Sequence, residues 1–238
     1  MSKLVSDTAM VMAAGLGKRM RPLTATTPKP MVRVAGKPLI DHALDRLADS
    51  GVDKAVVNIH YLGDALEAHV LERERPKVTI SDERDALLET GGGMIKAQDH
   101  LPDPFYCLNA DNIWLDGPRS AFHDLSARWN PDEMDALLLV VSHARAANFS
   151  GPGDFYMDPV GRLKRRSPGR IAPFIYTGIQ LVSKRLLRDA PEGKFSTNIL
   201  WNRAMEEGRL FGVSFTGLWF EVGTPDAIAP TEDALKRG

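Results

Sequence analysis

The feature that most constrains this chain is an apolar run followed at once by a glycine-rich loop. Residues 9–14 are apolar, and a short apolar run bounded by a turn is typical of a buried strand in a parallel sheet. Gly15 and Gly17 follow directly, and glycines let backbone amides approach a ligand closely. The loop then carries four cationic side chains: Lys18, Arg19, Arg21 and Lys29. Because ligands bind where strands of open α/β sheets end, the sequence predicts a polyphosphate site at this loop.

Two common phosphate-binding loops do not fit the sequence. The dinucleotide fingerprint needs a third glycine where Met20 stands. The Walker loop needs a glycine where Met12 stands, and Ser or Thr where Arg19 stands. Instead, the backbone around the cations is restrained by three prolines: Pro22, Pro28 and Pro30. These prolines favour an anion-binding site with a restrained backbone over a solvated strand-to-helix turn.

The charge of the chain is unevenly distributed. Residues 1–37 hold seven Lys or Arg and one acid, whereas the net charge of the whole chain is -1. A nucleic-acid binder usually spreads a basic face more widely and interleaves aromatic residues. Here aromatic residues make up only 7% of the chain, so nucleic acid is not the expected partner.

Length and composition predict an ordinary globular chain. We expect its 238 residues, 43% of them hydrophobic, to form one domain over residues 1–238. The N-terminus lacks the apolar core of a signal peptide, and no apolar run approaches the roughly 20 residues of a membrane span. The single cysteine, Cys107, lies within an apolar run, as a buried thiol in a reducing compartment would. We therefore expect a cytoplasmic protein with no membrane span.

Strand and helix patterns alternate along the chain. Strands are predicted at 9–14, 31–34, 54–59, 78–81, 105–111, 136–141, 175–182, 210–215 and 218–222, with a hairpin over 155–163. Helices are predicted at 39–48, 62–70, 95–98 and 197–204, and after residue 225. Such alternation predicts an α/β fold, a Rossmann-like three-layer sandwich around a mostly parallel mixed sheet.

Two later segments carry groups suited to the same ligand. Thr90 is followed by three glycines, residues 91–93, which permit close approach to a flat nucleobase but alone would indicate a helix-entry turn. Asp111 ends the strand predicted at 105–111. A carboxylate at the ligand edge of a sheet can hold Mg²⁺, although an Asp at a strand end is otherwise often a cap or turn residue.

The loop resembles that of a known family. Residues 15–24 and Thr27-Pro28-Lys29-Pro30 are similar to the signature of the sugar-1-phosphate nucleotidyltransferases. Residues 89–93 and 109–114 most resemble the branch that transfers uridylate to N-acetylmuramate 1-phosphate. The resemblance implies the nucleotide-diphospho-sugar transferase fold, with a nucleotide-binding part at about 1–115 and a sugar-binding part at about 116–238. It also implies that UTP and a sugar 1-phosphate react to give a UDP-sugar and pyrophosphate in cell-wall recycling.

The resemblance further assigns roles to single residues. Arg19 would stabilise the leaving pyrophosphate, and Lys29 would bridge the α-phosphate and the sugar phosphate. Mg²⁺ would be held by Asp111 and Glu221. The nucleotide would be bound by Ala14, Gly15, Gly17, Lys18, Arg19, Thr90, Gly91 and Gly92. The sugar would contact Asn109, Asn148, Thr177 and Gly178.

One residue departs from the family pattern. Glu221 stands where the family has Asp in a Trp-x-Asp-x-Gly-Thr-Pro segment. Glutamate keeps the charge but adds a methylene, and Mg²⁺ demands near-ideal octahedral geometry. Two alternatives stay open, of which only the second rests on Glu221. One is a guanylyltransferase for mannose or heptose 1-phosphate, and the other is a non-catalytic relative that binds a nucleotide sugar.

Overall fold

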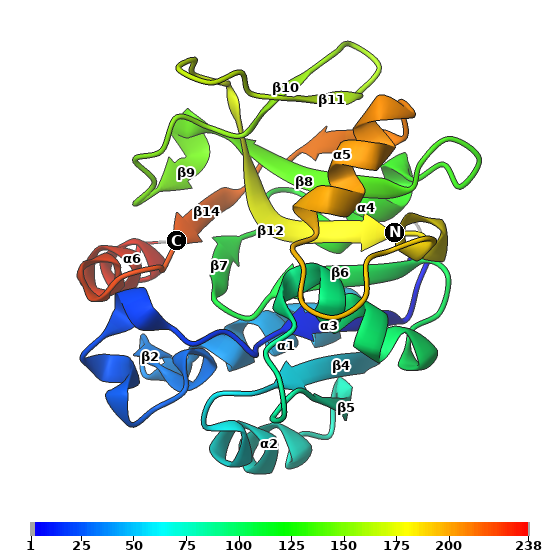
Figure 1. Cartoon of the computed structure of the whole chain (residues 1–238). Coiled ribbons are helices and arrows are strands. Elements are labelled where there is room, and N and C mark those ends of the chain that lie inside the picture. Colours follow the sequence, from blue (N-terminus) through cyan, green and yellow to red (C-terminus); the bar gives the residue numbers. More distant parts are fainter. Residues whose placement is uncertain (1–2, 238) are drawn as a thin grey trace.

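A central nine-stranded mixed sheet organises the computed structural model, which describes residues 3–237 (Figure 1). One half of this sheet is parallel, in the order β6-β1-β4-β5. Its strands are β1 (Thr8–Met12), β4 (Lys54–Ile59), β5 (Lys77–Asp82) and β6 (Phe105–Asn109). Met12 lies beside Asn109 in the register. Strands β1 and β6 therefore end together, and the loops that follow them share one edge of the sheet.

The other half is built around one long antiparallel strand. Strand β12 (Phe174–Val182) runs antiparallel to β6 and to β8 (Ala136–Ser142). Strand β13 (Leu210–Ser214) extends the sheet beyond β8 in parallel. A hairpin of β10 (Phe155–Met157) and β11 (Leu163–Arg165) joins the sheet at the start of β12. The hairpin thus stands over the edge where β6 ends (Figure 1).

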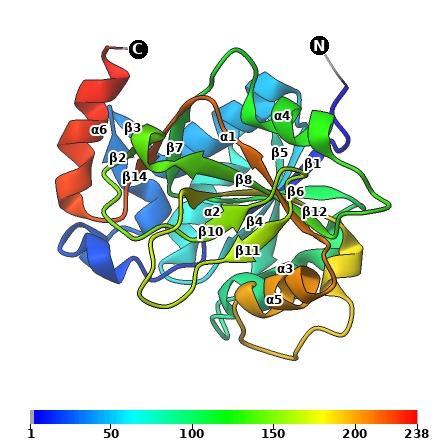
Figure 2. The same ribbon diagram turned by 90° about the horizontal axis from the view of Figure 1, so that it is seen from above.

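Helices cover both faces, because neighbouring residues of a strand point to opposite sides. Ala9 and Val11 of β1 belong to the core that contains α1 (Leu39–Ser50), α2 (Gly63–Leu71) and α4 (Ala121–Arg128). Met10 belongs instead to the core that contains α3 (Glu89–Ala97) and α5 (Asn198–Glu206). Figure 2 shows α3 and α5 on one side of the sheet, and α1 and α4 on the other. The predicted three-layer α/β architecture is confirmed.

A second, three-stranded sheet closes the ligand edge. It contains β7 (Asn112–Leu115), β14 (Leu218–Glu221) and β9 (Ala146–Ala147). Asn112 lies opposite Glu221 in the antiparallel pair β7–β14. This register brings Glu221 next to Asp111, the residue that precedes β7. The short strands β2 (Arg33–Val34) and β3 (Lys37–Pro38) and helix α6 (Ile228–Leu235) pack nearby.

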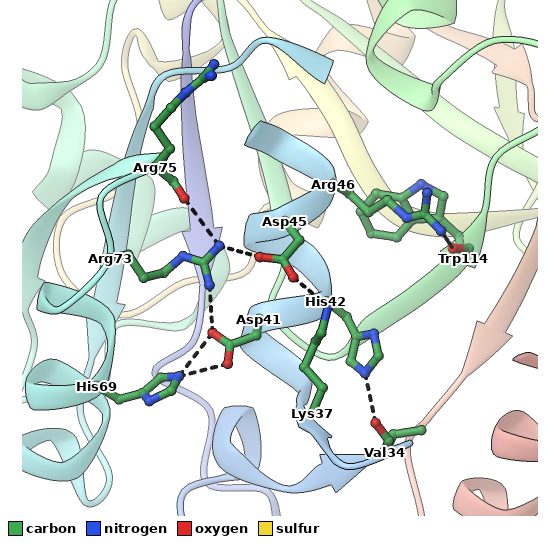
Figure 3. A network of polar contacts seen from close by, with 10 residues as sticks. All are labelled: Val34, Lys37, Asp41, His42, Asp45, Arg46, His69, Arg73, Arg75 and Trp114. Atoms are coloured by element: carbon green, nitrogen blue, oxygen red, sulfur yellow. Dashed lines mark hydrogen bonds and ion pairs between the residues drawn. The ribbon is translucent and has the colours of Figure 1, made fainter. Parts of the chain in front are cut away.

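A network of charged residues fixes α1 to the region of α2 (Figure 3). Arg73 donates to Asp41 at 3.1 Å and also to Asp45. His69 Nε2 lies 3.0 Å from both oxygens of Asp41, and Lys37 Nζ lies 2.5 Å from Asp45. The network links α1 to α2 and to the segment that follows α2. None of these residues lies at the ligand edge.

Most predicted strands and helices form close to their expected bounds. Sequence patterns missed β7 and α4, and the helix expected at 95–98 begins earlier, at Glu89. None of the helices in residues 3–237 is both long and apolar enough to cross a membrane.

Candidate active site

Three adjoining cavities form one cleft at the carboxyl end of β6, and Asn109 lines all of them. The first, here the loop cavity, encloses about 370 Å³. Its walls include Ala13, Ala14, Gly15, Lys29, Asn58, Glu83, Thr90 and Asp111. The hairpin cavity encloses about 330 Å³, and its walls include Asp154, Arg165, Tyr176, Thr197, Asn198 and Trp201. The carboxylate cavity encloses about 170 Å³, and its walls include Arg19, Asp111, Asn112, Thr177, Gly178, Trp219 and Glu221.

The basic loop folds back on itself at Gly17. This residue has φ +60°, and a Cβ added to it would lie 2.9 Å from Lys29 Cβ. The Thr24 hydroxyl donates to the Gly17 carbonyl at 2.8 Å. Only glycine fits this left-handed, crowded position. The fold of the loop therefore places Lys29 next to the turn that begins at Gly15.

Two ion pairs join the basic loop to the acidic strand ends. Lys29 Nζ lies 2.5 Å from Asp111 Oδ2, and the Lys29 side chain is only 12% exposed. Arg19 Nη1 lies 3.6 Å from Glu221 Oε1, and the Arg19 side chain is 70% exposed. The loop thus supplies two cations of the cleft, one fixed and one free to move toward a ligand.

The donor set of the carboxylate cavity fits a Mg²⁺ ion that is shared with a phosphate. The side chains of Asp111 and Glu221 are about one third exposed and line the same cavity. Across residues 3–237, no group of three or more His, Cys, Asp or Glu is placed to hold a metal. Mg²⁺ is commonly bound by one or two carboxylates together with waters and substrate phosphates. The two carboxylates therefore suit this ion when a phosphate completes its shell.

Two residues in the wall of the carboxylate cavity carry a buried side-chain N–H donor. Asn112 Nδ2 and Trp219 Nε1 have no hydrogen-bond partner among the residues that the structure describes. Buried polar groups are normally paired, so these donors are suited to the oxygen atoms of a ligand. Sequence patterns did not single out either residue for this role.

A buried pair of polar side chains supports the floor of the loop cavity. Asn58 Oδ1 accepts from the backbone N–H groups of Ala13 at 2.6 Å and Ala14 at 3.3 Å. Asn58 Nδ2 donates to Glu83 Oε1 at 2.7 Å, and Glu83 Oε2 accepts from the Leu88 N–H at 3.2 Å. Asn58 is 3% exposed and Glu83 is fully buried. No sequence pattern singled out either residue, although a polar Asn inside the apolar run of β4 was an available signal.

The glycines after Thr90 pack against residues 193–195, although they were predicted to contact the nucleotide. The N–H groups of Gly91 and Gly92 both donate to the carbonyl of Phe195, at 2.9 and 3.2 Å. A Cβ on Gly91 would lie 2.3 Å from the Phe195 ring, and a Cβ on Gly92 would lie 2.3 Å from the Gly193 carbonyl. These glycines let α3 pack against residues 193–195. Within residues 89–93, Glu89 and Thr90 line the cleft and the glycines do not.

Three other residues that were predicted to bind the nucleotide or the sugar do not line the cleft: Gly17, Lys18 and Asn148. Asn148 donates to the Thr231 hydroxyl at 3.0 Å and lines none of the three cavities. Lys18 is exposed and does not line them either. Thr177 lines the carboxylate cavity, but its buried hydroxyl donates to the Leu139 carbonyl at 2.9 Å. The structure thus ties Asn148 to α6 and leaves Thr177 and Gly178 as part of the wall.

The decisive comparison concerns the N-terminal part of the chain. Residues 8–150 match a family model described as Nucleotidyl transferase. The chain belongs to the nucleotidyl transferase family. Together with the relatives described next, this match confirms the sugar-1-phosphate nucleotidyltransferase resemblance seen in the loop.

Relatives of this nucleotidyl transferase extend the match along most of the chain. It is 43% identical to N-acetylmuramate alpha-1-phosphate uridylyltransferase of Caulobacter vibrioides, covering 95% of this chain and 96% of the relative. It is 33% identical to the enzyme of the same name from Neisseria meningitidis serogroup B, covering 91% and 93%. The solved structure of the inositol-1-phosphate CTP transferase from T. maritima covers 98% of this chain with a TM-score of 0.79, at 18% identity. That last likeness supports the fold.

Proposed function

We propose that this chain joins UTP and N-acetylmuramate 1-phosphate to give the UDP-sugar and pyrophosphate, a reaction of cell-wall recycling. The observation that carries the proposal is the cleft in which Lys29 and Arg19 meet the carboxylates of Asp111 and Glu221. The 43% identical relative supports this choice of reactants. We further propose that residues 1–115 bind mainly the nucleotide and residues 116–238 mainly the sugar.

The reaction needs positioned cations more than a base. The attacking phosphate oxygen is already an anion, so no side chain has to remove a proton. The barrier comes from bringing two polyanions together and from the charge that spreads around the α-phosphorus. In the proposed complex, Lys29 lies between the α-phosphate and the sugar phosphate, and Arg19 contacts the leaving pyrophosphate. The backbone at Ala14 and Gly15 faces the nucleotide in the loop cavity.

The carboxylates are proposed to hold Mg²⁺ once the nucleotide is present. When bound, the ion would neutralise charge on phosphate oxygens. Asp111 is engaged by Lys29 in this structure, so the carboxylate becomes available as Lys29 turns to the triphosphate. Asp111 and Lys29 therefore couple metal binding to nucleotide binding. Glu221 reaches the same cavity despite its extra methylene.

Pyrophosphate release tests the proposal. The chain would be assayed with each of the four triphosphates against a panel of sugar 1-phosphates, with N-acetylmuramate, N-acetylglucosamine, mannose and heptose 1-phosphates included. We expect the highest kcat/KM with UTP and N-acetylmuramate 1-phosphate. Preference for GTP with mannose or heptose 1-phosphate, or binding without turnover, would refute the assignment.

Three variants probe the mechanism in the same assay. Removal of one charge-stabilising contact typically lowers the rate by roughly 10² to 10³. We therefore expect losses of about this size for Arg19→Ala, Lys29→Ala and Asp111→Ala, with circular dichroism unchanged. Lys96→Ala removes an exposed cation of α3 and serves as the matched control. If one of the three variants keeps near-normal turnover, the residue that it replaces takes no part in the mechanism.

A further inference from the structure

We propose, on the basis of the function proposed above, that Arg165 determines sugar specificity by binding the lactyl carboxylate of N-acetylmuramate 1-phosphate. Arg165 belongs to a basic segment that also holds Arg162, Lys164, Arg166 and Arg170, and such a segment is typical of a solvated face. The structure instead places this residue in the wall of the hairpin cavity.

The guanidinium of Arg165 is held in place from two sides. It lies 5.1 Å above the ring of Phe155, in cation–π geometry. Its Nε donates to Asn202 Oδ1 at 3.2 Å, and its Nη2 donates to Asn198 Oδ1 at 3.1 Å. The hairpin strand and α5 therefore preorganise the cation at the cavity wall.

Within residues 3–237, the Arg165 guanidinium has no acidic side chain as an ion-pair partner. A guanidinium has five N–H donors, and the two bonds to Asn198 and Asn202 leave the others open within the described residues. No ion pair of Arg165 occurs in residues 3–237, and Asp154 in the same cavity accepts instead from the Tyr176 N–H at 2.9 Å. Burial lowers the pKa of Arg165, and the charge of Asp154 opposes that effect. A partly desolvated, unpaired guanidinium is suited to a carboxylate, which it can bind in bidentate fashion.

The rest of the hairpin cavity is suited to a sugar ring. Tyr176 and Trp201 meet edge to face, with ring centroids 4.8 Å apart, and both line the cavity. The Thr197 hydroxyl is buried and has no partner among the described residues. Apolar ring faces with a few polar groups are typical of small-molecule sites.

The connection between the cavities sets the direction of the sugar. Asn109 lies at the junction, with Asp111 in the loop and carboxylate cavities and Arg165 in the hairpin cavity. A sugar whose 1-phosphate lies near Asp111 would extend past Asn109 toward Arg165. N-acetylglucosamine 1-phosphate differs from the muramate by lacking the lactyl group. It would therefore leave the Arg165 guanidinium unpaired.

The test compares these two sugars in the full-length protein. With UTP as co-substrate, Arg165→Gln is expected to lower kcat/KM for N-acetylmuramate 1-phosphate by about 10- to 100-fold, the range for a hydrogen bond to a charged group. Turnover of N-acetylglucosamine 1-phosphate and the KM for UTP should stay within about threefold, since neither involves the carboxylate. Arg165→Lys should restore part of the muramate activity, because it keeps the charge but not the planar fork. Lys164→Gln, on the opposite face of β11 and exposed, is the matched control and should change neither sugar.

Calorimetric binding of the two products gives an independent readout. Arg165→Gln should weaken the binding of UDP-N-acetylmuramate by a similar factor and leave the binding of UDP-N-acetylglucosamine nearly unchanged. If the binding of both UDP-sugars weakens alike, Arg165 only supports Asn198 and Asn202, and the inference is overturned. If the wild type uses the muramate and Arg165→Gln keeps full discrimination, the inference fails while the proposed function stands. If the wild type does not turn over the muramate, both are overturned.

Discussion

Asn58 provides the sharpest test of how the loop cavity is held together. Asn58→Ala would remove the acceptor of the Ala13 and Ala14 N–H groups and the donor to Glu83. Each buried polar group left without a partner costs about 1–3 kcal/mol. Water from the adjoining cleft can satisfy part of this loss. We therefore expect the free energy of unfolding to fall by about 2–4 kcal/mol, with a weaker apparent affinity for UTP.

Asn58→Asp turns the same contact into a pH-dependent one. Asn58 Nδ2 lies 2.7 Å from Glu83 Oε1, and two buried carboxyls at such a distance cannot both ionise. One of them would keep a proton when folded, with its pKa raised above the unfolded value of about 4. The folded chain then binds more protons than the unfolded chain, so stability relative to wild type falls as the pH rises above about 4.

Urea unfolding of both variants between pH 4 and pH 8 measures these effects. Gln98→Ala, which truncates an exposed amide, is the control and should stay within about 0.5 kcal/mol of wild type. A loss below about 1 kcal/mol in Asn58→Ala would show that the network does not support the cavity. An Asn58→Asp stability difference that is constant with pH would show that the two carboxyls do not interact.

Three further predictions concern packing, the thiol and the ion pairs. Gly91→Ala should lower the free energy of unfolding by about 1–3 kcal/mol in urea titrations, because its methyl overlaps the Phe195 ring; wild-type stability would contradict this packing. Burial raises the pKa of Cys107 to about 12, so iodoacetamide at pH 8.5 should alkylate it only after unfolding, and rapid native labelling would refute its burial. Lys29→Met removes the cation that is paired with Asp111. In the absence of nucleotide, this variant should bind Mn²⁺ about tenfold more tightly than wild type, the factor for roughly 1.4 kcal/mol, as measured by electron paramagnetic resonance. An unchanged Mn²⁺ affinity would show that Lys29 and the metal ion do not compete for Asp111.

The ligand edge could be predicted because local patterns determine it. The apolar run before Gly15 and the one before Asp111 each indicate a buried strand, and parallel strands end at the same edge of a sheet. These two patterns therefore predict that the basic loop and Asp111 lie at the same edge. Glu221 joined them only through the resemblance, since its place depends on the pairing of β14 with β7.

The remaining features depend on contacts between distant segments. Gly91 is required by the Phe195 ring, and Asn148 is held by Thr231, residues about 80 to 100 positions away. Arg165 lies in a run of basic residues that resembles a solvated face, and only the packing of Phe155 and α5 brings it to the cavity. No periodicity or spacing encodes such pairings.

A crystal structure with Mg²⁺ and a non-hydrolysable UTP analogue would show whether the two cations and two carboxylates form one working centre. We expect the uridine in the loop cavity against Ala14, the phosphates contacted by Arg19 and Lys29, and the ion between Asp111 and Glu221. A nucleotide bound outside the cleft, or an ion that contacts neither carboxylate, would contradict the proposed site.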